Sequence, residues 1–303
     1  RLTGKEPWDE GKKLHIGVIN RQNPEDSIHI DTDGYMLVAS GEGNKLINAY
    51  VKNETRGFLD VDLDVKPNTV LALMNVLYLK EVWNDSSRDL DDTENKYNFE
   101  NSDKSTVNKK LLQGYYASGR AIKDSNFRKF YTCTNDGFRL PFIVPENGNQ
   151  ASDIYNYETL INRGYTTEVR EGNVVTRYHT RCMFPEFKAD VLQSVKSAIE
   201  SMGVKSLFTD GVCDLSNLVE SVEGAPGVYC REVKQAARLE VLRSGIEGAA
   251  VTIMEFDKSM DPGPDETIYK DVYEDFIVDK AFAYTLEDKF GNILFTGIVN
   301  KIN

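Results

Sequence analysis

The stretch of residues 240–266, EVLRSGIEGAAVTIMEFDKSMDPGPDE, constrains the fold of this chain more than any other. Read with period two, it places only uncharged residues on one face, namely Ile246, Gly248, Ala250, Thr252, Met254 and Phe256. The opposite face carries acidic residues, so the alternation predicts a half-buried strand. The small residues at the centre and the Asp-Pro-Gly-Pro-Asp run near the end predict an exposed loop instead. The chain therefore needs a fold in which one segment can be both loop and strand.

Composition and charge are those of an ordinary globular protein. The 303 residues are 40% hydrophobic, and no repeat or linker divides them, so we expect a single domain over residues 1–303. A net charge of −12 argues against nucleic acid or an anionic membrane as partner, because both attract basic surfaces. No run reaches the roughly 18 apolar residues of a membrane span. The first residues, RLTGKEPWDEGKK, do not form a signal peptide.

Cysteines and sequons bear on the cellular compartment. The four cysteines are widely spaced and form no CxxC motif, so we expect no zinc site and favour free buried thiols over two disulfides: Cys133, Cys182, Cys213 and Cys230. Asn53 and Asn84 begin Asn-x-Ser/Thr sequons, which permit glycosylation of a secreted protein. Such tripeptides also arise by chance. They favour an extracellular protein over a cytoplasmic one without fixing the compartment.

Hydrophobic patterns predict a chain of many strands and few helices, which is the α+β class. We expect helices at residues 43–56, closed by Gly57, and at 189–202. The apolar run 69–83 predicts a strand buried on both faces, and residues 84–112 predict a polar connection. Further strands are expected in two hairpins and at the C-terminus: in 129–144 with a turn at 135–137, in 166–187 around 171–173, and in 275–288 and 292–302.

The motifs of the common enzyme classes are missing. The chain has no HExxH, GxxxxGK[ST], GxSxG or GxGxxG, so we expect neither an enzyme nor a bound cofactor. The three histidines lie in strand-like contexts and are interpreted as structural residues. Asp31, Asp33 and Glu42 match positions of a calcium-binding loop, but Gly34 comes too early for the turn that such a loop requires. No metal site is therefore expected.

Several segments together resemble the serpin family. They are NAYVKNETRG, VLALMNVLYLKEVW, FPEFKADVLQSVKSAIESMGVKSLF, GIEGAAVT and DKAFAYTLEDKFGNILFTGIVNKI, and they occur in the order and near the spacing found in serpins. The resemblance runs from about residue 43 to the C-terminus, behind a shortened or incomplete N-terminal region. It implies large, mostly antiparallel β-sheets with packed helices and a reactive centre loop at about residues 243–271.

The resemblance also explains the two patterns in residues 240–266. A serpin inhibits a serine or cysteine protease irreversibly: its reactive loop is cut, the acyl-enzyme is trapped, and the loop inserts into the largest sheet as an extra strand. The hinge that enters first would be Gly245, Ile246, Glu247, Gly248, Ala249, Ala250, Val251 and Thr252. We expect residues 245–257 to be an exposed loop in the uncut chain. In the cut chain they should be a central antiparallel strand with Ile246, Ala250 and Met254 buried.

Two residue sets carry over from the family with changes. Serpins usually have Glu at the start of the hinge, paired with a Lys that follows the Pro of an adjacent strand. Those positions are Arg243 and Glu186 here, and we expect a charge-exchanged salt bridge between them at the sheet breach near Trp83. Asn75 matches the buried Asn of the family's shutter region, while its usual His partner is replaced by Gln235.

The family spacing places the reactive bond at Lys258–Ser259, or one residue later at Ser259–Met260. Lys258 before the bond would suit a trypsin-like serine protease as partner. Phe256 or Met260 would suit a chymotrypsin-like one, and the inhibitor itself is expected to be a monomer. The alternative is a non-inhibitory serpin that acts as a ligand carrier, storage or interaction protein. Ile246, larger than the Thr or Ser usual at that position, and Gln235 both favour this alternative.

Overall fold

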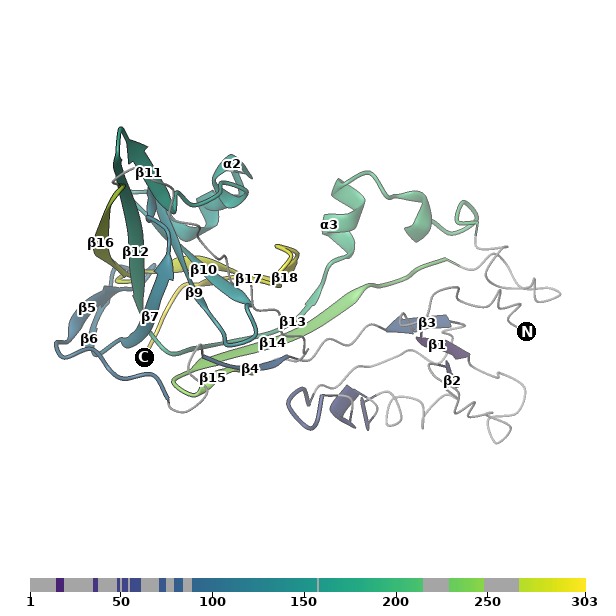
Figure 1. The fold of residues 1–303 in the computed structure, drawn as a ribbon. Coiled ribbons are helices and arrows are strands. Elements are labelled where there is room, and N and C mark those ends of the chain that lie inside the picture. Colours follow the sequence, from purple (N-terminus) through teal and green to yellow (C-terminus); the bar gives the residue numbers. More distant parts are fainter. Residues whose placement is uncertain are drawn as a thin grey trace. The chain divides into compact units, whose positions relative to one another are not determined.

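The computed structural model describes residues 15–18, 35–37, 48–49, 51–53, 55–60, 71–74, 79–83, 89–156, 158–214, 229–247 and 267–303 (Figure 1). Two compact units make up the chain. One consists of residues 1–78 and 190–238, and the other of residues 79–189 and 239–303. In the described part of the chain, no helix is long and apolar enough to cross a membrane.

The larger unit is built on a five-stranded antiparallel sheet in the order β18-β17-β10-β9-β8. Its strands are β8 (Ile122–Lys123), β9 (Phe127–Cys133), β10 (Arg139–Pro145), β17 (Phe282–Glu287) and β18 (Ile293–Val299). After its first residue β10 is buried throughout, as expected of a strand covered on both faces. Phe142 packs into the main core cluster, and Ile143 on the opposite face packs into a second cluster under the 3-10 helix η2 (Ala151–Asn156) and helix α2 (Glu158–Ile161).

The expected hairpin at residues 129–144 is confirmed. Strands β9 and β10 pair in antiparallel register, beginning with Cys133 opposite Arg139 next to the turn and ending with Phe127 opposite Pro145. Gly137 in the turn has φ +84°, a left-handed conformation that glycine adopts readily. The turn signal Asn135-Asp136-Gly137 thus located the reversal of the chain correctly.

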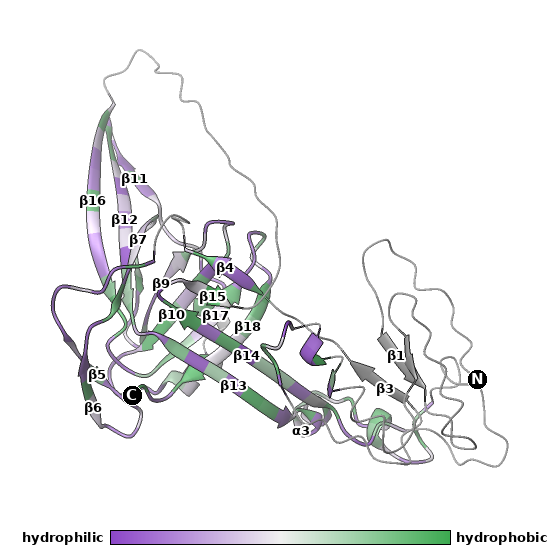
Figure 2. Ribbon diagram, turned by 90° about the horizontal axis from the view of Figure 1, so that it is seen from below, coloured by the Kyte–Doolittle hydropathy of each residue, from purple (hydrophilic) through white to green (hydrophobic). Residues whose placement is uncertain are grey.

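A second sheet of the larger unit combines β11 (Glu168–Glu171), β12 (Val174–Phe184), β16 (Ile268–Ile277) and β7 (Leu112–Ser118). The hairpin β11–β12 confirms the expected strands around residues 171–173. Strand β16 runs parallel to β12 over ten residue pairs, and His179 Nε2 of β12 lies 2.9 Å from Asp271 Oδ1 of β16. Figure 2 shows β11 mostly purple, in contrast to the hydrophobic strands of the five-stranded sheet. This sheet accordingly exposes much of its surface.

Two sequence-based boundaries in this unit were wrong. Residues 84–112 contain a hairpin, β5 (Tyr97–Glu100) with β6 (Thr106–Lys109), instead of a polar connection only. Its single buried side chain, Phe99, gives too weak a pattern for a strand prediction. The expected strand 275–288 is divided between β16 and β17, because residues 278–281 carry the chain from one sheet to the other.

A third sheet has the order β13-β14-β15-β4, with β13 (Phe187–Ser194), β14 (Lys234–Leu242), β15 (Gly245–Glu247) and β4 (Lys80–Val82). The helix expected at 189–202 begins too early in that prediction, since α3 covers only Lys196–Ser201. Residues 187–194 form a strand because β14 supplies hydrogen-bonding partners for their backbone. Val191 and Leu192, placed on the apolar stripe of the expected helix, are exposed on β13.

The smaller unit contains a three-stranded sheet in the order β2-β1-β3, formed by β1 (His15–Val18), β2 (Tyr35–Leu37) and β3 (Leu71–Met74). Residues 48–49 and 51–53 are helical, as expected within 43–56. The N–H of Gly57, which has φ +83°, donates to the Lys52 carbonyl at 2.6 Å and closes that helix. The expected α+β class is thus confirmed.

Candidate functional site

The first residues of the dual-pattern stretch form a strand inside the third sheet. Gly245, Ile246 and Glu247 pair antiparallel with Leu242, Val241 and Glu240 of β14 on one side. On the other side they pair antiparallel with Val82, Glu81 and Lys80 of β4. In Figure 1 the short strands β15 and β4 lie beside β14. Strand β15 therefore occupies the position between two strands that an inserting hinge would take.

This arrangement corrects, for residues 245–247, the expectation that 245–257 are an exposed loop in the uncut chain; residues 248–257 lie outside the described part of the chain. Ile246 is only 1% exposed and belongs to the main core cluster with Trp83, Leu239 and Val241. Burial of such a side chain contributes about 2 kcal/mol, which favours the strand over the loop. The large apolar side chain at this position thus holds β15, the start of the predicted hinge, in the sheet.

Gly245 makes the entry into the sheet sterically feasible. It has φ +150°, and a Cβ atom added there would lie 2.0 Å from the carbonyl oxygen of Glu81. Real Cβ atoms do not approach backbone this closely, so any other residue would push β15 away from β4. The turn at 243–244 and this close contact therefore depend on glycine.

Trp83, Glu186 and Arg243 meet at the start of the hinge, as the resemblance implies. Trp83 Nε1 donates to the Leu242 carbonyl at 2.8 Å, and the ring is 1% exposed. The backbone N–H of Arg243 donates to Glu186 Oε1 at 2.8 Å. The guanidinium of Arg243 instead contacts Asp92 Oδ1 at 2.8 Å.

The expected side-chain salt bridge between Arg243 and Glu186 is therefore wrong. The two residues are in contact, but the Glu186 carboxylate accepts from the backbone N–H of Arg243 and not from its guanidinium. The turn leaves the Arg243 N–H without a backbone acceptor in the sheet, so it donates a hydrogen bond to the exposed Glu186 carboxylate instead. The Arg243 guanidinium is free to pair with Asp92, a residue that the family spacing gave no reason to select. Both side chains of that pair are about two-fifths exposed, at 43% and 39%.

A buried acid faces the hinge and was missed by the sequence analysis. On β4 the exposed Lys80 and Val82 alternate with Leu79, Glu81 and Trp83, which point into the core. Glu81 is 5% exposed and lies opposite Ile246 in the register. Burial, with the charge of Asp136 in addition, raises the pKa of Glu81 from 4.5 to about 7, while a hydrogen bond from Thr134 opposes the shift. A charged residue at an inward position of the predicted strand was the available signal.

Other predicted site residues lie apart from this region or outside the described residues. Gln235 is exposed on β14. Asn53 is exposed, and the hydroxyl of its sequon partner Thr55 is buried, donating to the Val51 carbonyl at 2.7 Å and accepting from the Leu59 N–H at 3.0 Å. The residues outside the described part of the chain are Asp31, Asp33, Glu42, Asn75, Asn84, Gly248, Ala249, Ala250, Val251, Thr252, Lys258, Ser259 and Met260.

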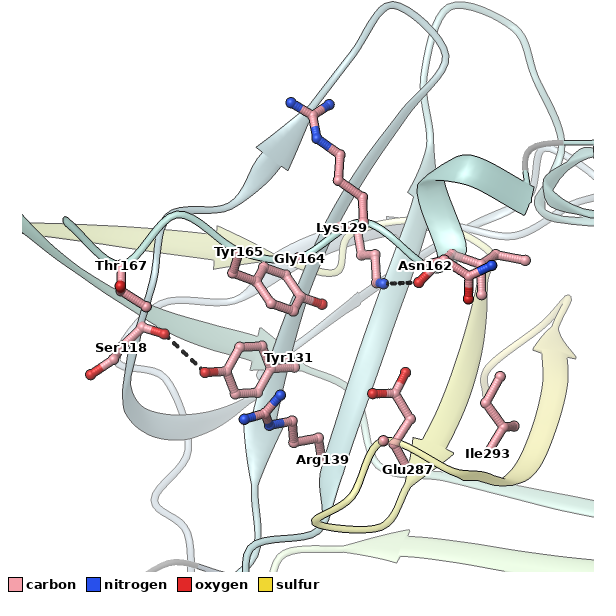
Figure 3. Close-up of a pocket in the computed structure, with 13 residues that line it drawn as sticks. Ser118, Lys129, Tyr131, Arg139, Asn162, Gly164, Tyr165, Thr167, Glu287 and Ile293 are labelled. Atoms are coloured by element: carbon pink, nitrogen blue, oxygen red, sulfur yellow. Dashed lines mark hydrogen bonds between the residues drawn. The ribbon is translucent and has the colours of Figure 1, made fainter. Parts of the chain in front are cut away.

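The larger unit also contains a cavity of about 350 Å³ beside strands β9, β10 and β17 (Figure 3). The buried ammonium of Lys129 donates to the Ile161 carbonyl, and burial lowers the pKa of Lys129. Tyr131 Oη donates to the Ser118 carbonyl at 2.9 Å. The buried hydroxyl of Tyr165 has no hydrogen-bond partner among the described residues. It points in Figure 3 toward the same space as the Glu287 carboxylate.

Comparisons with known proteins agree with these features. The family profile described as Serpin (serine protease inhibitor) matches residues 25–302. Serpin A3-6 of Bos taurus is 29% identical over 212 residues, which cover 68% of this chain and 47% of that protein. Glia-derived nexin of Mus musculus is 26% identical over 273 residues, covering 84% of this chain and 62% of that protein. This chain thus spans about half to two-thirds of the length of these relatives.

Solved structures show the same fold at low sequence identity. The structure titled thyroxine-binding globulin complex with thyroxine aligns with a TM-score of 0.61 at 16% sequence identity. The alignment covers 95% of this chain and 74% of that one. The similarity therefore concerns the arrangement of sheets and helices, and says nothing by itself about ligands or targets.

Proposed function

The chain belongs to the serpin family, and from this premise we propose that it is a suicide inhibitor of a trypsin-like serine protease. Serpins are not enzymes, and the family generally targets serine proteases as inhibitors. It also includes carriers such as thyroxine-binding globulin. An inhibitory serpin differs from a carrier in needing a hinge that can insert into the sheet.

The observation that carries the proposal is the position of β15 between β14 and β4. Insertion of a cut loop requires a sheet that accepts an antiparallel strand at this place, and the first three hinge residues already pair there on both sides. The next inward residues in the sequence are Gly248, Ala250 and Thr252, all small and uncharged. Continued insertion would therefore bury no charge and meet little steric resistance.

The proposed reaction begins when the protease serine attacks the carbonyl carbon of Lys258, and the amine of Ser259 leaves. Release of that bond frees the hinge side of the loop to insert beyond Glu247 with the acyl-enzyme still attached. Insertion buries apolar surface, which supplies the free energy that traps the protease before deacylation. If Ser259–Met260 is the bond instead, the same sequence of steps applies one residue later.

Incubation with trypsin and, in parallel, chymotrypsin tests the proposal. An SDS-stable covalent complex on a denaturing gel is the expected result, with the cut located by mass spectrometry of the released peptide. Complex formation with trypsin and a cut after Lys258 would support the trypsin-like target. Formation with chymotrypsin alone would move the target to that class. Cleavage by both proteases without any complex would make the protein a substrate and refute inhibition.

A matched pair of variants separates insertion from recognition. Ala250→Arg places a charge on the inward face of the inserting strand, whereas Ala249→Arg places it on the outward face. The inward variant should be cleaved without forming a complex, because its charge would be buried. The outward variant should still form the complex. Equal behaviour of the two variants would contradict strand insertion.

The cavity beside β9 supports a second candidate, a carrier of an anionic aromatic ligand. The cations of the lining, Lys129, Arg139 and Arg163, outnumber its one carboxylate, Glu287, which favours an anionic ligand. The Tyr165 hydroxyl can donate to a ligand carboxylate, and the Tyr131 and Tyr165 rings can contact an aromatic group. Thyroxine, the ligand named for the similar carrier structure, is a suitable probe. Saturable quenching of intrinsic fluorescence that weakens in Tyr165→Phe would favour this function, and unsaturable quenching would exclude thyroxine as its ligand.

A further inference from the structure

Cys213 and Cys230 are anchored on one short turn of the smaller unit. The turn consists of the 3-10 helix η3 (Ser206–Phe208) and the residue after it, Thr209. The N–H of Cys230 donates to the Leu207 carbonyl at 2.9 Å, and the N–H of Cys213 donates to the Thr209 carbonyl at 3.1 Å. Two residues far apart in the sequence are thus tied to acceptors only two positions apart.

Both thiols are partly exposed, and Cys213 lies near enough to Cys230 to affect its ionisation. Cys213 and Cys230 are partly exposed free thiols. Burial is the main cause of the raised pKa of Cys230, and the nearby Cys213 sulfur contributes to it. A disulfide requires Cα atoms within about 7 Å, a separation that backbones held on one turn can reach with little movement.

The other two cysteines provide a contrast within the same chain. Cys182 is fully buried, and Cys133 packs against the main core cluster. Burial raises the pKa of Cys133 to about 11 and raises that of Cys182 as well, so both stay protonated near neutral pH. Both sulfurs also pack into or against the main core cluster, so this pair reacts with a disulfide reagent more slowly than Cys213 and Cys230, although burial raises the pKa of Cys230 too.

We propose that Cys213 and Cys230 form an intrachain disulfide by exchange with a small-molecule disulfide such as oxidised glutathione. One cysteine thiolate attacks a glutathione sulfur and releases one glutathione thiolate. The second cysteine thiolate then attacks the protein sulfur of the mixed disulfide, and the other glutathione leaves. Two protein thiols are oxidised, one glutathione disulfide is reduced, and two protons pass to the released thiolates. The bond would close the segment 214–229 and hold the chain just before β14 begins at Lys234.

The experiment uses the full chain, first reduced with dithiothreitol, then freed of it and incubated with oxidised glutathione. Two of the four thiols should be lost to thiol titration without bound glutathione, and non-reducing peptide mapping should recover one peptide pair joining Cys213 to Cys230. The melting temperature should rise by about 5 °C, because the closed loop restricts the unfolded chain. Reduction should reverse both changes.

Single variants decide between a disulfide and simple accessibility. Cys213→Ser should retain a stable glutathione adduct on Cys230, and Cys230→Ser should retain one on Cys213, since the resolving thiol is gone. The control Cys133→Ser should still form the Cys213–Cys230 bond. Stable adducts on both cysteines of the wild-type chain, loss of no thiol, or a crosslink to Cys133 or Cys182 would each overturn the proposal.

Discussion

Replacing Glu81 by Gln removes one titratable group from the core side of β4 while nearly preserving its size and its capacity for hydrogen bonding with Thr134. Glu81 is 5% exposed and lies opposite Ile246, where the hinge enters the sheet. Its pKa is about 7 in the folded chain, against 4.5 for an ordinary glutamate. The folded state therefore binds a proton more tightly than the unfolded state.

The sign of the pH effect follows from this raised pKa. Below pH 4.5 the acid is protonated in both states, and its contribution to stability is fully present. Between pH 4.5 and about 7 the unfolded chain ionises first, so the contribution is lost as the pH rises. Since each pKa unit corresponds to about 1.4 kcal/mol, the wild type should lose about 3 kcal/mol over this interval relative to Glu81→Gln.

Urea unfolding at pH 5 and at pH 8 measures the difference. The Gln variant should be more stable by about 1 kcal/mol at pH 5, where the unfolded wild type is already partly ionised, and by about 3 kcal/mol at pH 8. Glu94→Gln, a change at an exposed glutamate of the same unit, is the control and should show no such gain. A stability difference between wild type and Glu81→Gln that is the same at both pH values would refute the reasoning.

Three further predictions concern the turn and the strand that begin the hinge. Gly245→Ala should displace β15 from β4 and speed limited proteolysis of the hinge, because a Cβ there would meet the Glu81 carbonyl. Gly164→Ala, where a Cβ meets open space, is the control and should not alter the rate; equal rates in all three proteins would contradict the role of the close contact. Ile246→Ala should lower stability by about 2–4 kcal/mol in urea unfolding, because it leaves a cavity in the core cluster, and a loss below about 0.5 kcal/mol would show that the side chain is not held there. Arg243→Ala should cost about 1 kcal/mol, since both side chains of its pair with Asp92 are about two-fifths exposed, and a double-mutant cycle of the two residues tests that coupling.

Local signals predicted the turns and the buried strands well. Gly137 and Gly172 both have positive φ at the tips of the expected hairpins. Within the run 69–83, Leu79 and Trp83 are buried as expected, but Lys80 and Val82 are exposed, so β4 is buried on one face only and the expected burial on both faces was wrong there. These features depend on residues close together in sequence. The alternation in 240–266 indicated a strand, and Gly245–Glu247 form one, but the prediction placed that strand in the cut chain only.

The features that sequence reasoning missed depend on partners far along the chain. Residues 189–194 contain an apolar set that suits helix or strand, and pairing with β14 decides for strand. The Arg243 guanidinium pairs with Asp92 and not with Glu186, because the Glu186 carboxylate accepts a hydrogen bond from the backbone N–H of Arg243 in the turn. The burial of Ile246 in the uncut chain likewise depends on the space between β14 and β4, which no local pattern describes.

The hydrogen-bonded pairing of β12 with β16 determines whether the two fragments of a cut molecule stay together. Strand β16 begins at Ile268, ten residues after Lys258, and is joined to β12 by a parallel register from Val174–Ile268 to Met183–Ile277. Beyond it, β17 and β18 complete one edge of the five-stranded sheet. A chain cut after Lys258 would therefore keep its C-terminal fragment without a covalent link. It would migrate as one particle in native gel filtration and separate into two polypeptides only when denatured.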